Sequence, residues 1–206
     1  MSKFPLIIFE GIECSGKSTQ LKNVVIFLKK NKKKFLYLRE PGGSNNSEKF
    51  RKLILNKNSN FNKFTDFLLY MASRSENMEK IIKKYYKKKI ILIDRFIYST
   101  IAYQHYGFGI NKNLIESLNK YLLTNIKPDH IFFHTVSNKN LKKRLQKRRI
   151  KNKYDKFDFK YYNKVQSGFK KIFKNKKNVT LINSDDQITI NKNTIIKRLQ
   201  RLLNDW

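Results

Sequence analysis

The sequence contains little cysteine, proline, glycine or acidic side chain. Its single cysteine, Cys14, excludes an intrachain disulfide framework, and three Pro with seven Gly are too few for a collagen-like or linker-dominated chain. No apolar run approaches the roughly 18 to 20 residues that cross a bilayer, and the first nine residues show no charged leader with a long apolar segment and cleavage site. We therefore expect a cytoplasmic protein that does not span a membrane.

Lysine is the residue that the chain has in excess. Its 206 residues include 46 Lys plus Arg against 15 Asp plus Glu, for a formal net charge of +31. Of these cations 37 are Lys and only nine are Arg, and they are dispersed along the whole chain. Because recognition of phosphates and bases relies on Arg as much as on Lys, we interpret the charge as solvated surface and biased composition. A dedicated nucleic-acid surface is the alternative.

Short apolar runs alternate with longer segments of helical period, which is the signature of a parallel sheet flanked by helices. The length and the 40% hydrophobic content suit one domain over 1–206. The expected strands are 6–9, 35–38, 90–93, 130–133 and 179–182. The expected helices are 17–30, 62–88, 114–123, 138–147, 159–173 and 193–203. The sequence thus predicts a single α/β domain with a five-stranded parallel sheet.

The strongest motif is GIECSGKST, which follows the first expected strand, opens the first expected helix and fits G-x-x-x-x-G-K-[ST]. In such a P-loop, glycines let backbone N–H groups face a phosphate, Lys17 reaches the β and γ phosphates, and Ser18 can hold Mg²⁺. The candidate ATP-binding residues are Gly11, Ile12, Glu13, Cys14, Ser15, Gly16, Lys17, Ser18 and Thr19. The motif predicts a nucleoside triphosphate site.

Arginines follow the second and third expected strands. Arg39 and then Arg51 come after the second strand, and Arg95 follows the third. Since ligands bind beyond the carboxyl ends of parallel strands, the three guanidinium groups converge on one crevice. Singly each would be a surface charge or a structural salt bridge, but together they suit the phosphate of an acceptor substrate.

Several motifs together resemble the bacterial thymidylate kinase family. They are Phe9-Glu10-Gly11, Arg39-Glu40-Pro41-Gly42-Gly43, Tyr70-Met71-Ala72-Ser73-Arg74, Asp94-Arg95 and Ser99-Thr100-Ile101-Ala102-Tyr103-Gln104. The resemblance runs from about residue 5 to residue 203. It implies a P-loop NTPase fold, transfer of the γ-phosphoryl group of ATP to dTMP with Mg²⁺ for dTTP biosynthesis, and a homodimer.

The resemblance also implies an acceptor site. The dTMP-binding residues would be Glu13, Arg39, Arg51, Tyr70, Arg74, Arg95, Thr100, Tyr103 and Gln104. The three arginines of the crevice would hold the dTMP phosphate, and Tyr70 would lie against the thymine ring. Arg74 and Gln104 would bond the polar edge of the base.

Further roles follow from the same resemblance. Tyr103 would crowd the 2′ position of the sugar, and Glu13 would contact its 3′-hydroxyl. Ser18 and Asp94 would lie at the metal. These assignments match the family residue by residue and do not follow from spacing.

The P-loop of this chain holds Glu13 and no Arg, so the resemblance implies that the transition-state cation comes from the lid, at about 144–158. Arg148 matches a lid arginine, and Arg149 or Lys153 could substitute for it in part. The expected catalytic residues are therefore Lys17, Arg95 and Arg148. A cation closing over the phosphates suits phosphoryl transfer, which depends on positioning and charge neutralisation.

Two other functions remain open from the sequence. One is a kinase for another nucleoside monophosphate or a deoxynucleoside, and the other is a basic nucleic-acid-binding protein with a vestigial P-loop. The three histidines, His105, His130 and His134, are not grouped like zinc ligands, and we interpret them as structural.

Overall fold

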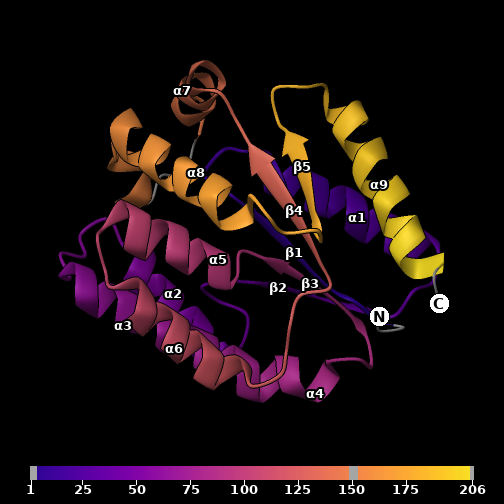
Figure 1. Cartoon of the computed structure of the whole chain (residues 1–206), viewed down its shortest axis with the longest axis horizontal. Coiled ribbons are helices and arrows are strands. Elements are labelled where there is room, and N and C mark those ends of the chain that lie inside the picture. Colours follow the sequence, from indigo (N-terminus) through magenta and orange to yellow (C-terminus); the bar gives the residue numbers. More distant parts are fainter. Residues whose placement is uncertain (1–3, 149–152, 205–206) are drawn as a thin grey trace.

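A parallel β-sheet forms the centre of the fold in the computed structural model, which describes residues 4–148 and 153–204. Within these residues the sheet has five strands in the order β2-β3-β1-β4-β5, and every neighbouring pair is parallel (Figure 1). The strands are β1 (Leu6–Gly11), β2 (Phe35–Arg39), β3 (Ile90–Asp94), β4 (His130–Thr135) and β5 (Val179–Asn183). All five carboxyl ends meet at one edge of the sheet, and the predicted fold class is confirmed.

Each strand lies where the sequence predicts it and runs one or two residues further at its carboxyl end. The apolar pattern stops early because the added residues, such as Glu10, Arg39 and Asp94, are mostly polar. Arg39 and Asp94 line the crevice, whereas Glu10 is buried beneath it. The central strand β1 is buried along its whole length. The edge strands are partly exposed, with Tyr37 of β2 46% and Leu181 of β5 61% exposed.

Helices connect the strands. Along the chain they are α1 (Lys17–Lys30), α2 (Asn45–Leu55), α3 (Lys63–Asn77), the π-helical η1 (Met78–Ile82), α4 (Lys83–Tyr85), α5 (Ile97–Thr100), the π-helical η2 (Ile101–Gly107), α6 (Lys112–Leu123), α7 (Asn138–Gln146), the 3-10 turn η3 (Lys153–Lys156), α8 (Phe159–Phe173) and α9 (Ile188–Asn204). A helix or turn therefore separates each strand from the next, as right-handed parallel crossovers require.

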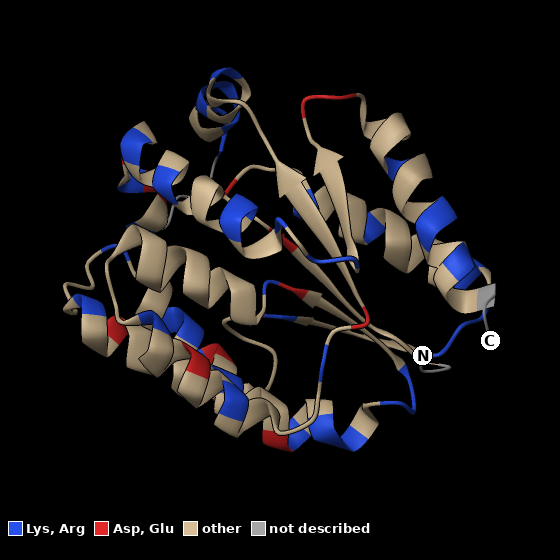
Figure 2. Cartoon of the chain, viewed as in Figure 1, with Lys and Arg blue, Asp and Glu red and all other residues tan. Residues whose placement is uncertain are grey.

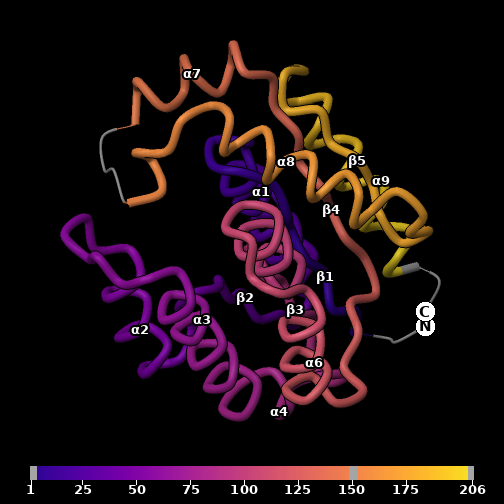
Figure 3. The backbone as a smooth tube through the Cα atoms, turned by 60° about the vertical axis from the view of Figure 1, so that its left-hand side comes forward, coloured from indigo at the N-terminus to yellow at the C-terminus, as the bar shows by residue number. Residues whose placement is uncertain are grey.

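The helices cover the two faces of the sheet unequally. On one face α1 and α9 pack together and bury Leu21, Leu28 and Leu199 against the sheet. On the other face η2 packs against α8, and α2, α3 and α6 form a further group (Figures 1 and 3). This second group stands beside the carboxyl edge of the sheet, where an acceptor substrate would enter.

Two helical segments were not predicted, and both have a physical reason. In α2 Ser47 and Ile54 are buried and Phe50 and Leu55 are partly buried, so its apolar stripe is confined to the second half of the helix. The Ser44 side chain caps the helix by accepting from the Ser47 N–H. The segment through α5 and η2 is largely buried and turns π-helical, which removes a 3.6-residue period. The helix expected at 193–203 is present but begins earlier, at Ile188.

The surface charge is distributed over the whole molecule. Lys and Arg lie on helices that cover both faces of the sheet and on the loops between them (Figure 2). In the residues that the structure describes, no helix is both long and apolar enough to cross a membrane.

Two histidines lie in the core strand β4. His130 Nε2 is 2.9 Å from Thr180 Oγ1 on β5, and His134 is fully buried beneath the P-loop. Burial lowers the pKa of His130 to about 4 and that of His134 to about 3, so both rings are neutral at pH 7. The described residues contain no cluster of three or more potential metal ligands, which supports the structural interpretation.

A neutral buried His130 makes stability depend on pH. Its folded-state pKa of about 4 lies below the ordinary 6.5, so the unfolded chain binds the extra proton as pH falls through 6.5, and stability is lost. From pH 7 to pH 5 this one residue should cost about 2 kcal/mol. Urea denaturation at the two pH values should show a loss smaller by about that amount in His130→Asn, since other titrating groups cancel in the comparison. Equal losses would contradict the assignment.

Candidate active site at the carboxyl edge of the sheet

The P-loop turns sharply from β1 into α1. Gly11 has φ +140°, and a Cβ there would stand 2.3 Å from the His134 carbonyl oxygen, so only glycine fits. The Lys17 Nζ donates to the carbonyls of Gly11 and Ile12, at 2.8 Å each. Burial, with a further contribution from Arg95, lowers the pKa of Lys17 to about 8. The loop therefore holds a desolvated cation that an anion would stabilise.

An ion pair joins this loop to the end of β3. The Arg95 Nη2 lies 3.0 Å from Glu13 Oε1, and its Nη1 donates to the Gly11 carbonyl at 2.7 Å. Tyr103 donates to the other Glu13 oxygen at 2.5 Å. Burial opposes ionisation of Glu13, but Arg95, Lys17 and this hydrogen bond outweigh it and hold the pKa of the carboxyl below its ordinary value. Glu13 is therefore ionised and fixed.

A second carboxylate, Glu10, shapes the Arg95 turn from beneath. It is fully buried and accepts from the backbone N–H groups of Phe96 and Ser99, at 2.9 and 3.2 Å, and from the Ser99 hydroxyl. Arg95 itself has φ +66°, a strained conformation for a non-glycine residue. Burial raises the pKa of Glu10 to about 7 against these hydrogen bonds. The sequence motif contains Glu10, but only the fold reveals its role.

Arg74 is buried at the far side of the crevice. It is 2% exposed, and its guanidinium bonds Glu40 at 2.8 Å, Asn119 Oδ1 at 2.6 Å and Thr100 Oγ1 at 2.9 Å. Beside it Gln104 Nε2 is buried without a hydrogen-bond partner. Sequence reasoning missed Asn119 and found Glu40 only as part of a family motif without a role, because buried partners of an arginine leave no pattern in a single chain.

Arg39 and Arg51 stand at the outer rim. Arg39 pairs with Glu48 at 3.0 Å and is about half exposed. The Arg51 Nη1 donates to the Pro41 carbonyl at 2.6 Å. Both guanidinium groups are held by α2, the helix that the sequence did not predict.

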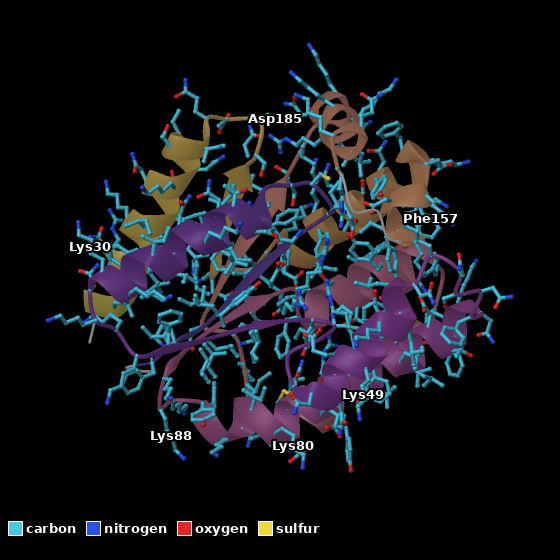
Figure 4. All side chains as sticks on the ribbon, turned by 180° about the vertical axis from the view of Figure 1, so that it is seen from behind. Lys30, Lys49, Lys80, Lys88, Phe157 and Asp185 are labelled. Carbon is cyan, nitrogen blue, oxygen red and sulfur yellow. The ribbon has the colours of Figure 1, made fainter. Side chains whose placement is uncertain are left out.

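These side chains line a single cavity of about 580 Å³. Figure 4 shows the side chains from behind, with Phe157 after η3 and Asp185 after β5 labelled on either side of the upper part of the molecule. The predicted residues that line the cavity are Glu13, Cys14, Ser15, Gly16, Lys17, Ser18, Thr19, Arg39, Arg51, Tyr70, Arg74, Asp94, Arg95, Thr100, Tyr103, Gln104 and Arg148. Gly11 and Ile12 do not line it, and instead accept from Lys17 beneath the loop.

The expected metal ligands fit a magnesium ion. Asp94 Oδ1 is buried without a hydrogen-bond partner, and Ser18 is exposed to the same cavity. Mg²⁺ is commonly held by one or two carboxylates with substrate phosphates and waters rather than by a cage of protein ligands. One orphaned carboxylate oxygen beside the P-loop matches that requirement.

The segment predicted as a lid contributes two of its described arginines to the cavity. Arg144 donates to the carbonyl oxygens of Cys14 and Ser184, at 3.0 and 2.5 Å, and so ties the P-loop to the end of β5. Arg148 pairs with the buried Asp155 at 2.7 Å. Lys153 pairs with Asp66 of α3. The basic run pointed to this segment, but it did not separate the roles of Arg144 and Arg148. Arg149, expected as a substitute cation, lies outside the described residues.

Comparison with known proteins gives one consistent family. The family model described as thymidylate kinase matches residues 9–195. The chain is 37% identical over 183 residues to the thymidylate kinase of Thermosipho africanus, covering 88% of this chain and 90% of that protein. It is 41% identical over 170 residues to that of Wolbachia pipientis, covering 81% and 83%. A crystal structure of thymidylate kinase from Ehrlichia chaffeensis superposes with a TM-score of 0.77 at 33% identity, covering 95% and 98%.

The buried Arg74–Glu40 ion pair should affect the free energy of unfolding. Arg74→Met leaves the Glu40 carboxylate buried without its cation, which should lower the free energy of unfolding by about 3 to 5 kcal/mol. Adding Glu40→Gln removes the stranded charge and should recover at least half of that loss. Urea denaturation of both variants measures the effect. If the loss of stability in the double variant equalled the sum of the losses in Arg74→Met and Glu40→Gln, that result would contradict the pairing.

Proposed function

The chain belongs to the thymidylate kinase family, and we propose from this premise that its cavity phosphorylates dTMP to dTDP with ATP, for dTTP synthesis. One observation carries the proposal: the P-loop and the three guanidinium groups of Arg39, Arg51 and Arg95 line the same cavity. A phosphate donor and a phosphorylated acceptor therefore have adjacent sites. Its place in nucleotide synthesis supports the cytoplasmic location expected from the sequence.

On the donor side the P-loop receives the triphosphate. Lys17, desolvated and held by two carbonyls, supplies positive charge at the β and γ phosphates. Arg144 keeps the loop in place through the Cys14 carbonyl. Ser18 and Asp94 would hold Mg²⁺, which when bound neutralises charge on the transferring phosphates.

On the acceptor side Arg39, Arg51 and Arg95 hold the dTMP phosphate so that its oxygen lies in line with the γ-phosphorus. Because Glu13 and Gly11 fix the Arg95 guanidinium, it bridges the two phosphate sites without reorganisation. Tyr103, held by Glu13, faces the sugar from the same side.

The base site selects thymine. Tyr70 lines the cavity on α3, and the unpartnered Gln104 Nε2 and the Arg74 guanidinium stand at its polar end. A base with the wrong edge leaves the buried Gln104 amide unpaired, which costs up to about 10⁴-fold in kcat/KM. This specificity separates dTMP from other nucleoside monophosphates.

ADP release with a panel of nucleoside monophosphates tests the function. We expect dTMP to exceed dCMP, dGMP and dAMP by orders of magnitude in kcat/KM, and turnover to stop when a chelator removes Mg²⁺. Equal use of dTMP and dGMP would remove the thymine assignment, and salt-sensitive DNA binding without turnover would favour the nucleic-acid alternative.

Lys17→Ala should abolish turnover and leave the circular dichroism spectrum unchanged, because only the phosphate cation is lost.

Arg148 is proposed as the cation of the transition state. Arg148→Ala should lower kcat by as much as about 10³-fold with little change in the KM of ATP or dTMP, because the interaction is made only in the transition state. Steady-state kinetics of Arg148→Ala and Lys153→Ala decide between the two lid cations. A collapse in Lys153→Ala with a silent Arg148→Ala would move the role to Lys153.

A homodimer is proposed through α3 and α6. Phe64 and Leu68 lie one turn apart on α3 and are 47% and 45% exposed, and Leu114 of the adjacent α6 is 38% exposed. Leu68→Glu should convert a dimer to a monomer in light scattering, because a buried charge without a partner opposes association. Ile26→Glu on α1, on the opposite side of the sheet and 63% exposed, is the matched control and should leave the mass unchanged.

A further inference from the structure

Two consecutive side chains of the short turn η3 contact α3, the helix that carries Tyr70 and Arg74. The Lys153 Nζ pairs with Asp66 Oδ1, and the Tyr154 hydroxyl lies 3.1 Å from Oδ2 of the same carboxylate. Asp66 lies in the first turn of α3 and is 3% exposed. One buried carboxylate thus fastens η3 to the helix that carries Tyr70.

The hydroxyl of Tyr154 also bonds Tyr70 directly. The two hydroxyl oxygens are 2.9 Å apart, and both side chains line the cavity. Since a carboxylate paired with a lysine only accepts, Tyr154 donates to Asp66 and must therefore accept from Tyr70. Burial raises the pKa of both tyrosines, so both hydroxyls keep their protons. The hydrogen bonds therefore run from Tyr70 to Tyr154 and from Tyr154 to Asp66. They hold the ring of Tyr70 in a fixed position in the cavity.

The residue after Tyr154 holds the lid arginine. Asp155 is 2% exposed and accepts from Arg148 Nη1 at 2.7 Å. The backbone of this turn is anchored from below, because Tyr162 of α8 donates to the Tyr154 carbonyl at 2.7 Å. The Tyr154 ring also packs edge-on against Tyr103, with centroids 5.8 Å apart. Two neighbouring side chains of one rigid turn therefore reach the base side and the phosphate side of the cavity.

We propose that Tyr154 is a positioning residue that fixes the side chains of Tyr70 and Arg148 relative to each other. The acceptor base is then held in place together with the cation at the transferring phosphoryl group. The inference rests on the proposed function. Tyr154 lines the cavity, and the role proposed for it is exerted through its neighbours. It acts on the base through the Tyr70 hydroxyl and on the phosphates through Asp155, which shares its turn.

Kinetics of Tyr154→Phe test this role. The change keeps the ring packing and removes the hydroxyl that bonds both Tyr70 and Asp66. Loss of the bond to Tyr70 should raise the KM of dTMP about fivefold. The kcat should fall by a similar factor because Arg148 is no longer held in a fixed position relative to Tyr70. The KM of ATP should not change. A merely structural hydroxyl would lower the melting temperature and leave kcat and both KM values at the parent level, and that result overturns the proposal.

A double-mutant cycle with Tyr70→Phe isolates the bond. Tyr70→Phe removes the same hydrogen bond from the other side, so it should raise the KM of dTMP to the same extent, and the double variant should raise it no further. Effects that multiply, or a parent-like KM in Tyr70→Phe, overturn the proposal even if Tyr154→Phe does not fold. Tyr86→Phe is the matched control, because that hydroxyl bonds the Lys127 backbone outside the cavity. A parent enzyme that does not phosphorylate dTMP would instead refute the proposed function.

Discussion

The ion pair between Arg95 and Glu13 is the interaction on which the crevice depends. It joins the loop after β1 to the turn after β3, two neighbouring strands whose parallel pairing places Phe9 beside Asp94. The Arg95 backbone adopts a left-handed conformation, and Glu10 supports this turn by accepting from the N–H groups of Phe96 and Ser99. Glu13 in turn orients Tyr103. One buried pair thus aligns the donor loop with the acceptor wall.

The charge in the cavity is unbalanced in a way that substrates correct. Seven cations and four carboxylates line it: Lys17, Arg39, Arg51, Arg74, Arg95, Arg144 and Arg148 against Glu13, Glu40, Asp94 and Asp186. Burial already lowers the pKa of Lys17 in this setting. Triphosphate and monophosphate groups supply the missing negative charge, so cations that repel one another become favourable contacts with the substrates.

The sequence predicts the strands and most of the helices well, because strands buried on both faces leave unbroken apolar runs, as β1 does. It also predicts the P-loop and Arg39, Arg51 and Arg95, which follow strand ends, whereas Tyr70, Tyr103 and Gln104 were expected in the cavity only from the family resemblance. It does not predict α2, whose apolar side chains are confined to its second half, or the π-helical η2. The partners that fix the site were missed for another reason. Glu40, Asn119 and Asp66 meet their arginine or tyrosine through tertiary packing, and no local pattern marks such a contact.

The arginines and lysines of this chain lie in different places. Most of the high net charge therefore lies outside the active-site cavity. Six of the nine arginines line the cavity, whereas Lys17 is the one lysine among the described residues that does so. A planar guanidinium can bond a phosphate with two N–H groups and a neighbouring carbonyl or carboxylate with others, as Arg95 does with Gly11 and Glu13. A flexible ammonium cannot fix that geometry. The lysines instead occupy solvated positions over both faces of the sheet (Figure 2). Compositional bias can therefore increase lysine on the surface without altering the chemistry, provided that the cavity keeps its arginines.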